Sequence, residues 1–271
     1  MPELPEVETT CRGLAPLLDG QRIAAVLVHE RRLRWPLPHG FEQTLTGRRL
    51  LTVRRRAKYL LIDTDGGTLL VHLGMSGSLR GADPATPRKT HDHVEIVLSS
   101  GRCLRFNDPR RFGSMHVVAG DPELHPLLAH LGPEPLSDDF DAHYLHGRTR
   151  GRRVAIKLLL MNAQIVVGVG NIYASEALFH AGVAPGRAAG RLSRAEVARI
   201  VAAIRQVLAA AIKVGGTTLR DYVNADGAPG YFSQKLYVYE RADEPCRRCA
   251  TPVRHRVQGQ RSTYWCPTCQ R

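Results

Sequence analysis

The sequence predicts an α+β protein with three parts: an N-terminal antiparallel β-sandwich that begins with a helix, a helical region, and a C-terminal β-hairpin. Short β-type runs separated by turns fill residues 23–118 without long helices between them, which is typical of an antiparallel sandwich. Helical periodicity follows between positions 154 and 213, and two Cys-x2-Cys pairs end the chain. The linker-like composition of residues 132–138 leads us to predict domains at 1–132, 133–236 and 237–271.

The chain begins with a helix signal. From Pro5 to Leu18, apolar side chains recur at three- and four-residue steps, and two acids in the first turn suit the helix dipole. The apolar positions are Val7, Cys11, Leu14 and Leu18. We therefore expect a short amphipathic helix here.

Pro2, directly after Met1, has two interpretations. A proline suits the first turn of a helix. Alternatively, removal of Met1 would make the nitrogen of Pro2 a free secondary amine, which can attack an aldehyde-level carbon and form an iminium, as lysine does in Schiff-base enzymes. Glu3 stands beside it and could move protons. The residue types alone leave both interpretations open.

Six β-type runs follow, and turn signals such as Asp65-Gly66-Gly67 separate them. The predicted strands are Ile23–Val28, Leu50–Val53, Tyr59–Asp63, Thr68–Leu73, Val94–Leu98 and Cys103–Asn107. Near the second strand, Arg54-Arg55-Arg56-Ala57-Lys58 places four cations in five positions. Such a run is usually a solvated face or a strip of phosphate contacts.

Two loops of this region present apolar side chains among small or basic residues. Met75 lies in a glycine-flanked loop after His72, and Phe112 follows Arg110 and Arg111. An exposed apolar side chain on such a loop can act as a wedge between bases.

The histidine pair His91-Asp92-His93 could suggest a metal site. Alternation along a strand is the simpler account, because it places both histidines on one face. We predict no metal there.

The helical region is strongly basic, because five cations occur with no acid between Asp141 and Glu176. They are Arg148, Arg150, Arg152, Arg153 and Lys157. Besides the cationic run at residues 54–58, we interpret this patch as a second basic surface for binding a polyanion.

Three helices are predicted in this region. The first covers Val154 to Met161, and a glycine-rich turn that ends at Asn171 separates it from the second, Ile172 to Ala181. A turn of this kind at a helix N-terminus presents backbone amides to phosphate. A capping box, Ser193 with Glu196, opens a third helix that runs to Lys213.

The two cysteine pairs predict a metal site. Cys246 and Cys249 are followed, after residues 250–265, by Cys266 and Cys269. Two such pairs form a tetrahedral thiolate zinc site, and a site with four protein ligands is structural. Two disulfides are the alternative, but they conflict with the reduced cytoplasmic compartment expected for a chain without a secretory leader.

The charge balance points to nucleic acid. The 271-residue chain has a formal net charge of +13, which favours a polyanionic partner, with nucleic acid ahead of a membrane surface. No long uncharged apolar run is present, so we predict no transmembrane helix and no membrane partner.

The first residues of the chain closely resemble the start of bacterial formamidopyrimidine-DNA glycosylases; they read Pro2-Glu3-Leu4-Pro5-Glu6-Val7-Glu8. Later sequence motifs extend the resemblance over nearly the whole chain. The resemblance implies that Pro2 is the nucleophile and Glu3 the acid/base. It implies that Lys58 reaches the phosphate and deoxyribose at the lesion and assists strand cleavage, and that Arg261, between the cysteine pairs, clamps the phosphates around the lesion.

The same resemblance implies the remaining DNA contacts. Met75, Arg110 and Phe112 would fill the gap left by an extruded base, with Arg110 facing the orphaned base. A helix–two-turn–helix element would place Asn171 on a phosphate, and a loop over residues 217–231 would cover the flipped base. His72, His91 and Arg152 complete the predicted DNA contacts.

The resemblance implies an enzyme, a bifunctional glycosylase and abasic-site lyase that acts on double-stranded DNA with oxidised purines or abasic sites. One structural zinc ion, a monomer, and a cytoplasmic, nucleoid-associated location belong to this expectation. Two alternatives stay open: an endonuclease VIII-like glycosylase for oxidised pyrimidines, and a non-catalytic zinc-ribbon protein that only binds damaged DNA.

Overall fold

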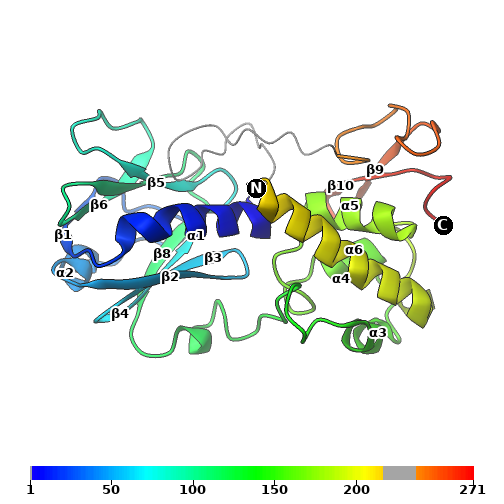
Figure 1. The fold of residues 1–271 in the computed structure, drawn as a ribbon, viewed down its shortest axis with the longest axis horizontal. Helices are drawn as coiled ribbons and strands as arrows, with labels where there is room; N and C mark the ends of the chain where they lie inside the picture. Colours follow the sequence, from blue (N-terminus) through cyan, green and yellow to red (C-terminus); the bar gives the residue numbers. More distant parts are fainter. Residues whose placement is uncertain (1, 216–235) are drawn as a thin grey trace. The chain divides into compact units, whose positions relative to one another are not determined.

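The structure, a computed structural model, describes residues 2–215 and 236–271, and these form two compact units (Figure 1). The first unit comprises residues 2–129, and the second comprises residues 130–214 with 236–271. The predicted loop over residues 217–231 lies outside the described residues. Within the described ranges, no helix combines the length and the apolar character needed to cross a membrane.

The first unit contains two four-stranded antiparallel sheets, which confirms the predicted sandwich class. One sheet has the order β1-β6-β7-β5 and the other β2-β3-β4-β8. The strands are β1 (Ile23–Val28), β2 (Leu50–Arg56), β3 (Tyr59–Thr64), β4 (Gly67–His72), β5 (Ser78–Ala82), β6 (Asp92–Leu98), β7 (Cys103–Asn107) and β8 (Ser114–Val118).

Helix α1 (Leu4–Leu18) packs on strands of both sheets, as its amphipathic pattern predicts. Val7, Leu14 and Leu18 are buried in one core with residues of the strands and of the short helix α2 (Phe41–Leu45). Glu8 of α1 accepts a hydrogen bond from Arg55 of β2 at 2.9 Å. The start of the chain is thus held against the second sheet by apolar packing and by an ion pair.

A buried ion pair stabilises the end of the first sheet. Arg80 of β5 donates two hydrogen bonds to Asp92 of β6, at 2.9 and 2.8 Å, and both side chains are almost fully buried. Asp92 also accepts hydrogen bonds from Asn107 and from the backbone N–H of Lys89. Burial acts to raise the pKa of Asp92, but these hydrogen bonds outweigh it and hold the pKa below 3.8, its ordinary value.

Asp92→Asn is expected to lower the free energy of unfolding at pH 7 by about 3–5 kcal/mol, because it leaves the Arg80 guanidinium buried without its counter-charge. The pKa of Asp92 is lowered in the folded state, so the stabilisation is present above its ordinary pKa and is lost as the pH falls through the folded value. Urea unfolding at pH 7 and pH 3 measures both effects. Asp83→Asn, which changes an exposed acid in the connection between β5 and β6, is the control; equal losses in the two variants would contradict the prediction.

The second unit contains four α-helices and a hairpin among its described residues. They are α3 (Ala142–Thr149), α4 (Ile156–Leu160), α5 (Asn171–Ala181), α6 (Arg194–Lys213), β9 (Arg254–Gln258) and β10 (Arg261–Trp265). Ser193 and Glu196 form the predicted capping box at the start of α6. The predicted helix over 154–161 is shorter than expected and begins at Ile156.

The C-terminal hairpin shares a hydrophobic core with the helices. Phe179 of α5 packs in one buried cluster with Val238, Val253, Cys246 and Cys266. The division into three domains at 1–132, 133–236 and 237–271 remains a prediction. Residues 237–271 share their buried core with Phe179 of α5.

Candidate functional site

Pro2 and Glu3 lie at the start of α1. Pro2 is buried and Glu3 is 2% exposed. Glu3 is the N-cap residue of the helix, and its backbone N–H donates a hydrogen bond to Oε2 of Glu6 at 2.8 Å, one half of a capping box. Helix α1 therefore sets the orientation of the residue pair for which the sequence predicts the chemistry.

The arginines of the cationic run each have a carboxylate partner within the first unit. Their side chains lie at the edge strand β2, where acids from three different segments reach them. The pairs are Arg54–Asp63 (2.8 Å), Arg55–Glu8 (2.9 Å) and Arg56–Glu123 (3.3 Å). These three residues therefore stabilise the fold rather than form a bare strip of phosphate contacts.

Lys58 lies in the two-residue turn that joins β2 to β3. Ala57, before it, has φ of 54°, and its carbonyl accepts a hydrogen bond from Arg55 at 2.9 Å. The arginine thus stabilises the left-handed turn that carries Lys58. Lys58 lies close enough to His72 for its charge to affect that ring.

His72, at the end of β4, is neutral at pH 7. Burial, followed by the charges of Lys58 and Arg34, lowers the pKa of His72 to about 4. Its Nδ1 accepts a hydrogen bond from the backbone N–H of Gly74 at 3.0 Å, so the ring proton is on Nε2. His72 can therefore offer a phosphate one neutral N–H donor.

The structure brings the predicted wedge residues together. Gly74 has φ of +67°, and a Cβ at this position would lie 2.5 Å from the backbone nitrogen of Gly113, so the two loops are in backbone contact. Arg110 Nη1 lies 4.0 Å from the sulfur of Met75, and Phe112 is 48% exposed. An exposed ring, a thioether and a guanidinium therefore occupy one small area of the first unit.

Asp108 organises these loops and was missed in the sequence analysis. Its buried carboxylate accepts hydrogen bonds from Gly113 N–H at 2.7 Å and from the Ser76 hydroxyl at 3.5 Å. Its carbonyl lies 2.8 Å from Nε2 of His93. The signal in the sequence was the aspartate of an Asn-Asp-Pro turn, a residue type that binds its own backbone.

His91 differs from the expected alternation. It precedes β6 and is exposed, whereas His93 is buried, and the strand register shifts between Asp92 and Val94. The two rings are nevertheless 6.0 Å apart. A cavity of about 420 Å³ opens beside them, lined by His29, Glu30, Arg88, Thr90, His91, Asp92, His93, Pro109 and Arg111.

Asn171 is the first residue of α5 in the second unit. Gly170 is the N-cap residue, so no side chain caps the first turn. Oδ1 of Asn171 is buried and accepts no hydrogen bond among the residues the structure describes. Arg152, in the turn after α3, is exposed. Arg152 therefore presents its guanidinium to solvent, where a ligand of this unit can reach it.

Arg261 is exposed at the start of β10. The hairpin turns through Gly259 and Gln260, with φ of 52° and 59°, the left-handed pair of a type I′ turn. A Cβ on Gly259 would lie 2.8 Å from Leu158, so the turn rests on α4. Beneath the turn, fully buried Lys157 donates hydrogen bonds from Nζ to the Ser262 carbonyl (2.9 Å) and the Thr263 hydroxyl (2.8 Å).

Lys157→Met is expected to weaken DNA binding about tenfold with the metal site intact, because the hairpin next to Arg261 loses both hydrogen bonds from α4. Fluorescence anisotropy with abasic-site duplex measures the dissociation constant. Lys213→Met is the matched control, since it removes an exposed positive charge at the end of α6. If both variants bind equally well, α4 does not position the hairpin.

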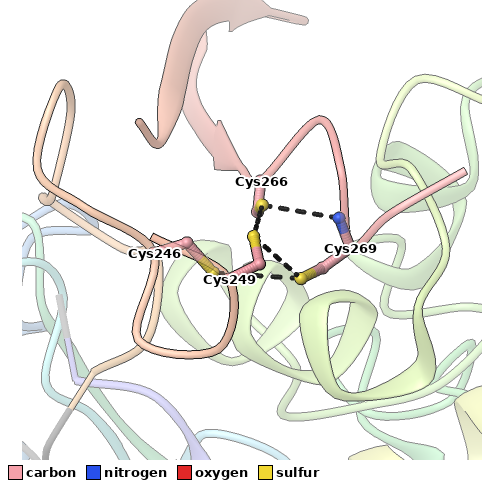
Figure 2. Close-up of side chains that lie close together, drawn as sticks. All are labelled: Cys246, Cys249, Cys266 and Cys269. Carbon is pink, nitrogen blue, oxygen red and sulfur yellow. Dashed lines mark hydrogen bonds between the residues drawn. The ribbon is translucent and has the colours of Figure 1, made fainter. Parts of the chain in front are cut away.

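The four cysteines of the last segment form a single cluster (Figure 2). Sγ of Cys249 lies 3.5 Å from those of Cys266 and Cys269, and the Cys246–Cys269 distance is 3.9 Å. Bonds of about 2.3 Å from zinc to sulfur place tetrahedral ligands about 3.8 Å apart. A disulfide bond of about 2.05 Å does not match these separations. The cluster therefore fits one structural zinc ion.

Backbone groups support the cysteine ligands. The N–H groups of Arg248 and Cys269 point to the sulfurs of Cys246 and Cys266, each at 3.4 Å. Such hydrogen bonds orient thiolates around a metal and offset their charge.

Comparison with known proteins covers the whole chain. Family models described as the formamidopyrimidine-DNA glycosylase N-terminal domain, its H2TH domain, and a zinc finger found in FPG and IleRS match residues 1–115, 131–223 and 243–271. Proteins named formamidopyrimidine-DNA glycosylase from Thioalkalivibrio sulfidiphilus and Methylococcus capsulatus are 62% and 58% identical over 271 residues, with 100% of each chain covered.

Solved structures show the same similarity. The MutM (Fpg) protein of Thermus thermophilus is 43% identical, with a TM-score of 0.88 over 99% of this chain and 98% of that one. A Lactococcus lactis Fpg variant in complex with Fapy-dG-containing DNA is 32% identical, with a TM-score of 0.93 over 100% of both chains. The Lactococcus lactis Fpg in complex with abasic-site DNA is 33% identical, with a TM-score of 0.92 over 99% of both chains.

Proposed function

The chain belongs to the formamidopyrimidine-DNA glycosylase family, and from this we propose that it is a DNA repair enzyme that removes oxidised purines from duplex DNA and then cleaves the strand at the abasic site. The observation that carries the proposal is the match of all three family models along one chain, with 62% identity to a full-length relative. Its partner is double-stranded DNA containing 8-oxoguanine, formamidopyrimidines or abasic sites.

The chemistry follows from a free amine at the N-terminus. The target nucleotide must leave the stack, because its reactive carbon is inaccessible inside the duplex. The nitrogen of Pro2, freed by removal of Met1, attacks C1′ of the deoxyribose, and the bond to the base breaks. Glu3 supplies and removes protons as the sugar ring opens. The resulting Schiff base acidifies C2′, so β-elimination and then δ-elimination expel the two phosphates and leave a one-nucleotide gap with a phosphate on each side. Water then hydrolyses the Schiff base, which releases the sugar remnant and frees the amine of Pro2.

Residues of the first unit would hold the DNA strand that carries the lesion and would fill the gap that the extruded base leaves in the stack. Lys58 would reach the phosphate and sugar at the lesion, with His72 as a neutral donor beside it. The contact between Met75 and Arg110, and the exposure of Phe112, support their insertion where the base leaves. His91 would contact the DNA backbone.

Residues of the second unit would bind phosphates. We propose that Asn171, Arg152 and Arg261 do so, with Arg261 clamping the phosphates around the lesion. Zinc, bound by the four cysteines, holds the hairpin and takes no part in the reaction. We also propose that the protein acts as a monomer in the bacterial cytoplasm, on nucleoid DNA.

A lesion panel tests this function. Duplexes with one 8-oxoguanine, formamidopyrimidine, thymine glycol or abasic site are incubated with enzyme, and the products are resolved on denaturing gels. Rapid cleavage at the oxidised purines is the expected result. Cleavage confined to thymine glycol would favour an endonuclease VIII-like enzyme, and binding without cleavage would indicate a damaged-DNA binder.

Glu3→Gln is expected to slow base excision about 10²–10⁴-fold while lesion binding stays near normal, because the amide keeps the shape but cannot exchange the proton. Single-turnover excision of 8-oxoguanine and anisotropy on the same duplex measure the two effects. Asp19→Asn removes an exposed charge at the C-cap of the same helix and should excise at close to the wild-type rate. Equal loss of binding and excision in Glu3→Gln would instead identify a structural role for its cap of α1.

A further inference from the structure

Glu176 is a buried acid in a basic unit. It lies in the middle of α5 and is 3% exposed. Its carboxylate accepts three consecutive backbone hydrogen bonds from the segment that enters the zinc hairpin region. The donors are the N–H groups of Tyr237 (2.8 Å), Val238 (2.9 Å) and Tyr239 (2.9 Å).

The contribution of Glu176 to stability depends on pH. Burial raises the pKa of Glu176, and the three N–H groups and the charge of Arg241 only partly oppose this effect. An acid whose pKa is raised on folding contributes stability below its unfolded pKa and loses that contribution as the pH rises. The ionised carboxylate therefore stabilises the fold less than the protonated acid does, although it is held by three backbone hydrogen bonds.

The contact between Glu176 and residues 237–239 connects the two elements, α5 and β10, that carry predicted phosphate contacts. Helix α5 begins at Asn171, five residues before Glu176. On the other side, Tyr239 packs edge-on against Tyr264 of β10, with ring centroids 5.3 Å apart, and β10 begins at Arg261. Tyr237 stacks on Phe179 of α5 at 5.3 Å. The carboxylate thus joins the helix of Asn171 to the strand of Arg261 through one short segment.

We propose that Glu176 is a positioning residue for DNA binding: by holding the backbone of residues 237–239 on α5, it sets the spacing between Asn171 and Arg261. The inference rests on the proposed function, because the phosphates of a DNA strand are the ligand that requires this spacing. Glu176 itself touches no DNA. Its effect passes through the backbone it binds, so it acts on affinity and not on the chemical step.

Glu176→Gln tests the proposal. The amide keeps the volume, but its NH2 group faces a backbone N–H and loses at least one charge-assisted hydrogen bond. The dissociation constant for abasic-site duplex should rise about tenfold, the effect of one such bond. The single-turnover rate at saturating enzyme should stay within about twofold of wild type, and bound zinc should be retained. Hydrogen exchange should show faster exchange of the amides of residues 237–239.

Glu240→Gln is the matched control, because it removes the same charge from an exposed position of the same segment. It should bind at least as tightly as wild type. Unchanged affinity in Glu176→Gln, or equal changes in both variants, would overturn the proposal. So would loss of zinc together with affinity, since Glu176 would then serve only folding. Borohydride trapping of the wild-type protein tests the proposed function separately, because a wild type that binds but never traps refutes the chemistry and leaves the binding comparison valid.

Discussion

A chain extended before Met1, so that Pro2 stays inside a peptide bond, is expected to form no borohydride-trapped adduct with abasic-site DNA. The lone pair of an amide nitrogen is delocalised into the carbonyl, so it cannot form the iminium that borohydride reduces. Adduct formation should fall to background, while binding of the duplex persists through the contacts of both units. A gel shift of the denatured adduct measures the first quantity and anisotropy the second.

Two controls make this result specific. The same extension ending in a protease site, cut so that Pro2 becomes the first residue, should restore trapping. Pro2→Gly, with Met1 removed, retains a primary amine and should trap more slowly but measurably. Efficient trapping by the uncut extended chain would show that another amine forms the Schiff base, and Lys58 would then be the first residue to substitute.

Removal of zinc is expected to have the second large effect. Cys249→Ser, or strong chelation, should weaken binding of abasic-site DNA about 10- to 100-fold, since one charge-assisted phosphate contact is worth about 1.5–3 kcal/mol. Arg261 would lose its place because the folding free energy of a small metal hairpin comes from the metal. Lyase activity should fall with binding, although Pro2 and Glu3 are unchanged.

The structure also changes what zinc loss should do to stability. The sequence suggests that the helices would stay folded without zinc, because they have their own apolar faces. Cys246 and Cys266, however, are buried in one cluster with Phe179 of α5. Thermal unfolding of the second unit should therefore shift to lower temperature when zinc is removed, whereas that of the first unit should not.

Arg261→Ala separates the phosphate contact of the hairpin from its zinc-dependent folding. It should lower affinity with zinc bound and thermal unfolding unchanged, and reduce the slope of log affinity against log salt by about 0.9, the value for one phosphate contact. The control for Cys249→Ser is Cys103→Ser, which removes a thiol in β7 of the first unit, outside the metal cluster. Zinc-free protein that binds abasic DNA as tightly as the zinc-bound form would contradict the coupling.

Local signals predicted much of the fold. Strands Ile23–Val28 and Cys103–Asn107 have the predicted bounds, and α6 begins directly after Ser193, the N-cap of the predicted capping box. The two cysteine pairs predicted the metal cluster, because ligand spacing within a turn is a local property. Two strands and two short α-helices were missed. Asp141 at the N-cap of α3 was a readable signal, but α2 is only five residues long.

The missed strand β5 shows why local patterns fail. It carries Arg80, a residue that sequence patterns assign to the surface, and its burial depends on Asp92 of another strand. The arginines of the cationic run present the same difficulty. Arg55 looks like a phosphate contact until the fold brings Glu8 within 2.9 Å of it. A charge is stable in the interior only with its partner, and the partner comes from a distant segment.

The sequence by itself determined the family, the order of most of the elements, the zinc ligands and the residues expected to act on DNA. Each of these depends on residue types and spacings within short windows. Only the tertiary structure decided that Asp108 joins the two wedge loops, that Lys157 lies under the hairpin, and that Glu176 binds the backbone of residues 237–239. These contacts link segments far apart in the chain, where free energy depends on burial and hydrogen-bond geometry that no local pattern records.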